Sequence, residues 1–268
     1  MVETMAPSIK IHLLGPTAVE IPGGWYGGLS PQLRKVLAVL AVTRKVPLSA
    51  EQIVKRVWNG EAPESAVQMV RNHIRALRQL SGTFERDVVE RSHAGYQLAA
   101  VGLEIDAEQF RSLLQEGRLL RAAGHPAEAV RALERGLGLW HGLEALVDVR
   151  DVPDLRVEAV GLEELRFQAE EMIAEGYIAL GRSADALPIL RAMTMMHPSR
   201  EWPWLQLMVA QALIGRRIEA SGETYRRARH HLVDQTGLDA PLLAQVHRAL
   251  LCGIDGHDLI IMITHRER

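Results

Sequence analysis

The stretch that decides the fold reads PESAVQMVRNHIRALRQLSG and runs from Pro63 to Gly82. Its apolar residues recur at steps of three and four, which is typical of the buried side of a helix; they are Val67, Val70, Ile74 and Leu77. The other side carries amide and basic residues, namely Gln68, Arg71, Asn72, Arg75 and Arg78. No carboxylate occurs between Ser65 and Thr83, although an exposed helix face usually mixes both signs of charge. The stretch therefore predicts a helix that presents only guanidinium and amide groups.

Guanidinium and amide groups contact phosphates and read purine edges in the major groove of DNA. We predict that Arg71, Asn72 and Arg75 contact base edges. Gln68 and Arg78, at the margins of the same face, are predicted to contact phosphates. For each of the first three residues, a phosphate contact stays an equal alternative. The alternative for the whole helix is a solvated basic face that binds no DNA. The neighbouring segments decide between a DNA-binding face and a solvated one.

The segments at the start of the chain predict a small sheet. Ile9–Leu14 and Ala18–Ile21 are short aliphatic runs that indicate two strands of an antiparallel sheet. The glycine-rich stretch between residues 23 and 28 lacks the Lys-Ser/Thr ending of a phosphate-binding loop. We therefore interpret that stretch as a turn.

Two helices and a hairpin frame the basic helix. Ser30 can cap a first helix, and Ser49 can form a capping box with Gln52 at the start of a second. After the basic helix, Val88–Glu90 and Tyr96–Leu98 flank a short tip, which predicts a β-hairpin. Strands, three helices and a hairpin follow one another as in a winged helix of the response-regulator type, with the third helix recognising DNA. The remaining candidates for phosphate contacts are Gln32, Arg34, Lys55, Arg91, His93 and Tyr96.

Residues 106–251 carry long helical patterns and no strand pattern. Gly124, Gly181 and Gly215 each end one such pattern, and each is followed by an acid and a small residue in the next. The last two glycines are 34 residues apart, which is the period of tetratricopeptide repeats. The earlier interval is longer because a segment from Trp140 to Pro153 is inserted. This pattern predicts an all-helical domain of stacked helix pairs. The predicted organisation is a winged-helix domain (α+β) over residues 1–103, a tetratricopeptide-like all-α domain over 104–252, and a tail of unknown role over 253–268.

The net charge of the 268-residue chain is −2. Residues 1–103 hold 12 Lys and Arg against 8 Asp and Glu, whereas the remainder holds 19 against 25. A basic front half and an acidic back half predict different partners for the two domains.

Several classes of protein are excluded by composition. The single cysteine, Cys252, excludes an internal disulfide framework, and no stretch approaches the roughly 18 apolar residues of a membrane span. We expect a cytoplasmic, nucleoid-associated protein without a membrane partner. The eleven His are scattered, with no HxxxH or CxxC pair and no nucleophile elbow. We therefore predict no catalytic residue, no metal and no cofactor.

Two groups of apolar residues in the second half of the chain can be interpreted in more than one way. A cluster between repeats is interpreted as core, with a ligand pocket left open because tetratricopeptide concavities bind peptides; it comprises Met193, Met195, Met196, Trp202 and Trp204. The short apolar run Leu259–Thr264 in the tail can pair with the edge of a partner.

At this point the chain resembles a known family, the Streptomyces antibiotic regulatory proteins, in which a winged helix is fused to a bacterial transcriptional activation domain of tetratricopeptide type. The resemblance is carried by IHLLGP (11–16), AGYQL (94–98), Asp106, Phe110, LWHGLEAL (139–146), LEELR (162–166), HPSREWPWLQLM (197–208) and YRRAR (225–229). It implies a pathway-specific activator of a secondary-metabolite or antibiotic gene cluster that binds direct repeats in a promoter. We also expect no phospho-acceptor domain before Ile9 and no ATPase or phosphothreonine-binding module after Leu251.

The resemblance further implies recruitment of RNA polymerase, through its sigma factor and core, by protomers bound head to tail on DNA. The loop before the basic helix carries the candidate polymerase contacts Asn59, Glu61 and Glu64. The negative charge of the two glutamates disfavours contact with phosphate. We expect the free protein to be mainly monomeric. The rival hypothesis is a tetratricopeptide adaptor or ligand sensor whose winged helix does not bind DNA.

Overall fold

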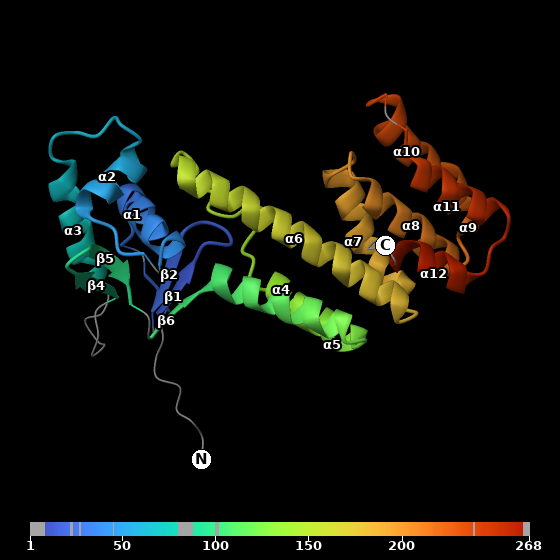
Figure 1. Cartoon of the computed structure of the whole chain (residues 1–268), viewed down its shortest axis with the longest axis horizontal. Coiled ribbons are helices and arrows are strands. Elements are labelled where there is room, and N and C mark those ends of the chain that lie inside the picture. Colours follow the sequence, from blue (N-terminus) through green and yellow to red (C-terminus); the bar gives the residue numbers. More distant parts are fainter. Residues whose placement is uncertain are drawn as a thin grey trace, which may run out of the picture. The chain divides into compact units, whose positions relative to one another are not determined.

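The computed structural model describes residues 9–21, 24–26, 28–44, 46–79, 88–99, 102–237 and 239–264. Contacts divide the chain into two compact units. The first unit comprises residues 1–112 and 136–165, and the second comprises 113–135 and 166–268. Residues 104–112 and 136–165 thus pack with the N-terminal part of the chain, beyond the predicted domain boundary at residue 103. Figure 1 gives the element labels used below.

The first unit contains a four-stranded sheet in the order β3-β2-β1-β6. Its strands are β1 (Ile9–His12), β2 (Ala18–Ile21), β3 (Gly24–Trp25) and β6 (Leu103–Ile105). The first two confirm the predicted antiparallel pair, although β1 ends two residues early. β6 pairs parallel to β1, with Lys10 opposite Glu104, and no sequence pattern predicted it. The interpretation of the glycine-rich stretch as a turn is wrong for Gly24, which pairs with Ile21 in β3; Gly23 and Gly27 lie outside the described residues.

Three helices follow, and the first two start at the predicted caps. In α1 (Pro31–Val42) the Ser30 hydroxyl accepts a hydrogen bond from the Leu33 N–H. In α2 (Ala50–Trp58) Ser49 and Gln52 form the full capping box. α3 (Ala66–Gln79) packs against both earlier helices. Capping bonds of this kind satisfy backbone N–H groups that a helix start leaves without partners, so they mark helix starts locally.

The predicted hairpin is also present, as β4 (Val89–Ser92) and β5 (Gly95–Leu98). Tyr96 and Leu48 exchange two backbone hydrogen bonds of 2.8 and 2.9 Å, which attach the hairpin to the residue just before α2. Gly95 has φ +137°, and a Cβ built there would lie 2.2 Å from the Leu48 carbonyl oxygen. Only glycine fits this close approach without displacement of the backbone.

The inserted segment, residues 138–152 between α5 (Pro126–Leu137) and α6 (Pro153–Ala179), packs within the first unit. Its backbone donates hydrogen bonds from His141 to the Leu14 carbonyl at 2.7 Å and from Leu146 to the Leu13 carbonyl at 2.9 Å. The side chain of Leu146 is fully buried. The segment is therefore part of the core around β1 rather than only an insertion between repeats.

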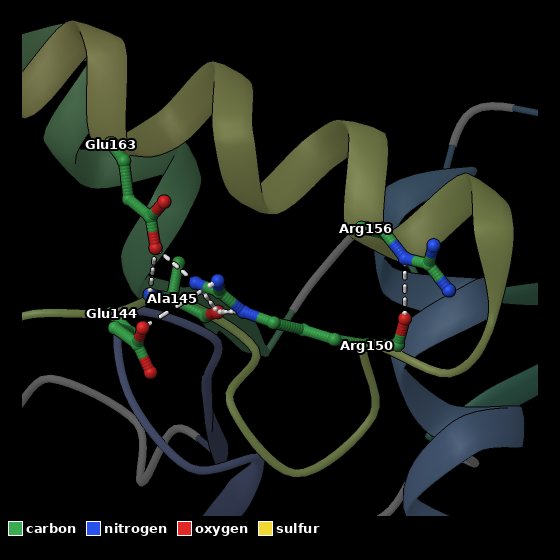
Figure 2. A network of polar contacts seen from close by, with 5 residues as sticks. All are labelled: Glu144, Ala145, Arg150, Arg156 and Glu163. Atoms are coloured by element: carbon green, nitrogen blue, oxygen red, sulfur yellow. Dashed lines mark hydrogen bonds and ion pairs between the residues drawn. The ribbon is translucent and has the colours of Figure 1, made fainter.

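Arg150 closes the inserted segment against α6 (Figure 2). Its Nε and Nη2 donate to the Ala145 carbonyl at 3.0 and 2.8 Å, and it forms an ion pair with Glu163 of α6. Glu163 also accepts a hydrogen bond of 3.1 Å from the Ala145 N–H. Arg156 Nε donates to the Arg150 carbonyl at 3.0 Å. This network holds a segment without regular secondary structure in one conformation.

The second unit is built from helices, and none of its described residues forms a strand. It contains α5, parts of α4 (Asp106–Ala122) and α6, then α7 (Ser183–Met196), α8 (Glu201–Leu213), α9 (Arg217–Glu219), α10 (Tyr225–Arg229), α11 (Pro241–Leu251) and α12 (Gly256–Thr264), with π-helical turns η1 (Ala220–Thr224) and η2 (His230–Asp234). Gly124, Gly181 and Gly215 each end a helix, as predicted, and their φ of +78°, +73° and +83° show the left-handed conformation common at helix ends. A winged helix-like domain followed by an all-helical domain is thus the fold.

Two expectations about apolar residues are wrong. Met193, Trp202 and Trp204 are buried, but Met195 and Met196 are 72% and 58% exposed, because they lie on the outer side of α7. The tail run forms the helix α12 rather than a strand, and it buries Leu259 and Ile263 completely. Among the described residues, no helix has both the length and the apolar character needed to cross a membrane.

Candidate nucleic-acid interface

The exposed face of α3 carries the predicted base-reading residues. Val70, Ile74 and Leu77 are buried on the inner side, and Val67 is only half-buried. The exposed residues of the outer side are Gln68, Arg71, Asn72 and Arg75. Gln68 donates a hydrogen bond of 3.2 Å to the Asn72 side-chain oxygen, which orients both amides along the helix.

A hollow of about 520 Å³ separates α3 from the β4–β5 hairpin, which lie beside each other in Figure 1. Six residues predicted from the sequence to contact DNA line it, three from the helix and three from the hairpin: Arg71, Arg75, Arg78, Arg91, His93 and Tyr96. The helix positions and the hairpin positions are 13 to 25 residues apart in the chain, so their meeting in one groove depends on how the hairpin is attached, to Leu48 and to α3. The groove places the basic face of α3 beside Arg91 of the hairpin.

Two arginines of this groove have no acidic ion-pair partner among the described residues. Within the described part of the chain, neither Arg71 nor Arg75 forms an ion pair. The one lining carboxylate, Glu51, has its pKa lowered first by a hydrogen bond from its own backbone N–H, then by the Ser49 side chain, and least by the charge of Arg71. Glu51 therefore serves the start of α2 more than it neutralises Arg71.

Arg78 differs from the other two arginines of α3. Its Nε donates a hydrogen bond of 2.9 Å to the Val89 carbonyl of β4. This bond fixes the distance between helix and hairpin, so Arg78 positions the groove from within the protein. His73, on the same helix, is half-buried, and burial lowers its pKa.

The predicted contacts on α1 lie in another environment. Arg34 forms an ion pair of 2.8 Å with Asp148 of the inserted segment and donates from Nε to the Leu29 carbonyl at 3.3 Å. Gln32 is half-buried, and its Oε1 has no hydrogen-bond partner among the described residues. Because Arg34 is already paired with Asp148 within the protein, it is not part of the proposed interface.

Two further cations of α1 and α2 are paired in the same way. Lys35 pairs with Asp151, and Arg56 pairs with Asp154 at the start of α6. The three acids, Asp148, Asp151 and Asp154, recur at intervals of three residues. This spacing is the only feature of the sequence that indicates a shared role in ion pairing, and it does not identify the cations that they pair with.

The loop between α2 and α3 carries the candidate polymerase contacts. Asn59 ends α2 in the left-handed conformation, with φ +47°, and Gly60 follows with φ +96°. Asn59, Glu61 and Glu64 are all exposed. Lys55 is exposed as well, and it lines a second hollow of about 620 Å³ together with Asn59.

Comparison with known proteins places this geometry in a family. Residues 105–251 match the family described as bacterial transcriptional activator domain, and residues 27–98 match that described as transcriptional regulatory protein, C terminal. The chain belongs to the Streptomyces antibiotic regulatory proteins. Members of this family are transcriptional regulators, and all the candidate DNA contacts of this chain lie within residues 27–98.

Individual relatives of the Streptomyces antibiotic regulatory type are similar over most of the chain. The transcriptional regulatory protein EmbR of Mycobacterium tuberculosis is 31% identical over 252 residues, which cover 92% of this chain and 64% of EmbR. The regulatory protein DnrI of Streptomyces peucetius is 28% identical over 93% of this chain and 94% of DnrI. A solved structure of Mycobacterium tuberculosis EmbR in complex with a low-affinity phosphopeptide superposes with a TM-score of 0.85, at 30% identity, over 95% of this chain and 68% of that one. The chain thus spans about two thirds of the length of EmbR.

Proposed function

We propose that this chain is a transcriptional activator that binds promoter DNA through α3 and the β4–β5 hairpin. The observation that carries the proposal is the groove between them, where Arg71, Arg75 and Arg91 converge and where Arg71 and Arg75 form no ion pair with a described residue. In helix-turn-helix proteins the second helix of the pair enters the major groove, while flanking elements contact the backbone. A face of guanidinium and amide groups suits both contacts.

Within this proposal, Arg71, Asn72 and Arg75 contact base edges, because they are exposed together on α3. The contacts to phosphates come from residues at the margins of that face, in the hairpin and on the two earlier helices; they are Gln68, Arg91, His93, Tyr96, Lys55 and Gln32. Arg78 acts by holding the hairpin, since its Nε is already bonded to the protein.

The proposal extends to the promoter and the transcription machinery. We expect two protomers to bind direct repeats head to tail and to activate a secondary-metabolite gene cluster by recruiting RNA polymerase. The exposed Glu61 and Glu64 support a protein contact at the α2–α3 loop, because carboxylates repel phosphate. A basic helix of a sigma factor is the partner whose charge fits them.

The test of DNA binding is fluorescence anisotropy with the gene's own upstream region and with a scrambled fragment, each at two salt concentrations. Specific binding should be tighter to the upstream region, and its affinity should fall with salt as counterions are released from contacted phosphates. Equal affinity for both fragments, or none for either, would refute the proposal and favour the adaptor hypothesis.

The test of polymerase contact is Glu61→Lys, with Glu64 kept so that the start of α3 is unchanged. We expect unaltered promoter binding and a reduced transcript from saturated promoter in a purified run-off assay. Glu223→Lys, on an exposed position of the second unit, is the matched control for charge. An undiminished transcript would move the polymerase contact away from this loop.

A further inference from the structure

Three side chains that are distant in sequence meet beside the end of β1. They are His12 at the end of β1, Asp106 at the start of α4 and His141 in the inserted segment. His12 Nδ1 lies 3.2 Å from His141 Nε2 and 3.5 Å from Asp106 Oδ2. All three ligand atoms lie within 4.8 Å of one another. His12 and Asp106 are buried, whereas His141 is exposed and leaves the cluster open to solvent on one side.

Two of the three separations are those of neighbouring ligands around one metal ion. Tetrahedral Zn²⁺ binds imidazole nitrogen and carboxylate oxygen at about 2.0–2.2 Å, which places neighbouring ligand atoms about 3.4 Å apart. The two short distances from His12 Nδ1 bracket this value. A single proton on Nδ1 can be donated well to only one of the two acceptors that converge on it, whereas a cation satisfies all three atoms together.

The surroundings hold the three side chains as ligands are usually held. Asp106 accepts hydrogen bonds from the Leu13 N–H at 2.8 Å and from the Leu14 N–H at 3.2 Å, so its carboxylate cannot turn away. His12 Nε2 lies 3.4 Å from Glu20 Oε2, although without the angle of a hydrogen bond. Metal-bound His usually directs its other nitrogen to a carboxylate in this way.

The backbone of His141 is also fixed, by its 2.7 Å hydrogen bond to the Leu14 carbonyl. The approach is so close that a Cβ on Gly15 would lie 3.0 Å from the Cβ and the carbonyl oxygen of His141. The Trp25 ring, centred 4.8 Å from the His12 ring, covers one side of the cluster. The backbone around the cluster is therefore held in place, and ion binding needs only a side-chain movement that closes the widest separation of up to 4.8 Å.

We propose that His12, Asp106 and His141 bind one divalent transition-metal ion of the Zn²⁺ class. Two imidazoles and one carboxylate favour such ions over Mg²⁺ or Ca²⁺, which prefer sites made only of oxygen. With three protein ligands the fourth position is left to water. The ion ties the inserted segment to β1 and to the start of α4, and so holds the acids that pair with α1.

The experiment is calorimetric titration of the full chain with Zn²⁺ after removal of metal with a chelator. Wild type should bind one equivalent at this site, and Zn²⁺ should raise its unfolding temperature. His141→Ala, at an exposed position, should weaken binding at least about tenfold and abolish the stabilisation by Zn²⁺. Glu20→Gln, which removes the carboxylate beside His12 Nε2, should weaken binding about tenfold.

His125→Ala, at an exposed position in the second unit, is the matched control and should leave binding unchanged. Circular dichroism checks that each variant is folded, and His141→Gln replaces His141→Ala if the latter is not. Absence of a saturable site in the wild type would overturn the proposal. Zn²⁺ binding of equal affinity and stoichiometry in a folded His141 variant would overturn it as well.

Discussion

The first unit carries two basic surfaces that differ in their partners. On α1 and α2, Arg34, Lys35 and Arg56 each form an ion pair with an acid of the inserted segment or of the start of α6. On α3, Arg71 and Arg75 form no ion pair with any described residue. The two surfaces have similar composition in the sequence, so counting charges does not separate them.

The difference teaches that a DNA-binding surface is distinguished by cations without ion-pair partners, rather than by the number of cations. Ion pairs at the surface contribute only about 0–1 kcal/mol each to stability, so the paired surface is not needed to hold the fold. Pairing does, however, remove much of the attraction that a cation has for phosphate. The paired surface is thus neutral toward DNA, and the unpaired surface keeps its charge for a partner.

The largest expected effect concerns the hairpin that forms one wall of the unpaired surface. Gly95→Ala places a methyl group against the Leu48 carbonyl and strains a positive φ, so we expect it to lower the free energy of unfolding by about 3 kcal/mol. Urea denaturation measures this. Gly60→Ala is the matched control, because φ is +96° there but nothing lies within 4 Å; it should cost only about 1 kcal/mol.

The second prediction compares the two surfaces directly. Arg75→Ala should weaken specific DNA binding by about 1–3 kcal/mol, because a guanidinium that forks onto a base is lost. Arg34→Ala should change the binding free energy by less than about 0.5 kcal/mol, because its charge is already paired. Anisotropy titrations measure both variants. Equal losses of binding free energy in the two variants would show that the ion pair of Arg34 does not prevent it from contacting DNA.

The third prediction converts a paired cation into an unpaired one. Asp148→Asn removes the charge beside Arg34 and keeps one oxygen for the Thr17 N–H, so the loss of stability should be about 1 kcal/mol. The released Arg34 should make DNA binding steeper in salt, by up to about one unit of the logarithmic slope. Asp185→Asn, in an exposed pair of the second unit, is the control. An unchanged slope would place Arg34 out of reach of DNA.

The smallest effect is a pH dependence of α3. Burial lowers the pKa of His73 from its ordinary value of 6.5, so the unfolded chain binds a proton more readily than the folded chain. Stability should therefore fall as pH decreases through 6.5, and His73→Gln should remove this part of the dependence. Urea denaturation of both proteins between pH 8 and 5 measures it. A His73→Gln profile parallel to that of the wild type would contradict it.

The elements of the proposed interface could be predicted because their signals are local. The three-and-four spacing on α3, the serines that cap α1 and α2, and the glycines that end later helices each act within a few residues. The short strands β3 and β6 could not be predicted, because two or three residues carry no periodicity. Met195 and Met196 were misplaced because an apolar side chain does not show which face of α7 is covered.

The sequence by itself determined the winged helix, the helical repeats and the acid-free face of α3, since periodicity, capping and charge depend on residues that are close in the chain. Only the tertiary structure decided which cations are paired and which side chains meet at His12. The inserted segment reaches the first unit through backbone hydrogen bonds to Leu13 and Leu14, more than 120 positions away in the chain. Such pairings depend on how the whole unit packs, because no local preference of residues 138–152 selects the surface they cover.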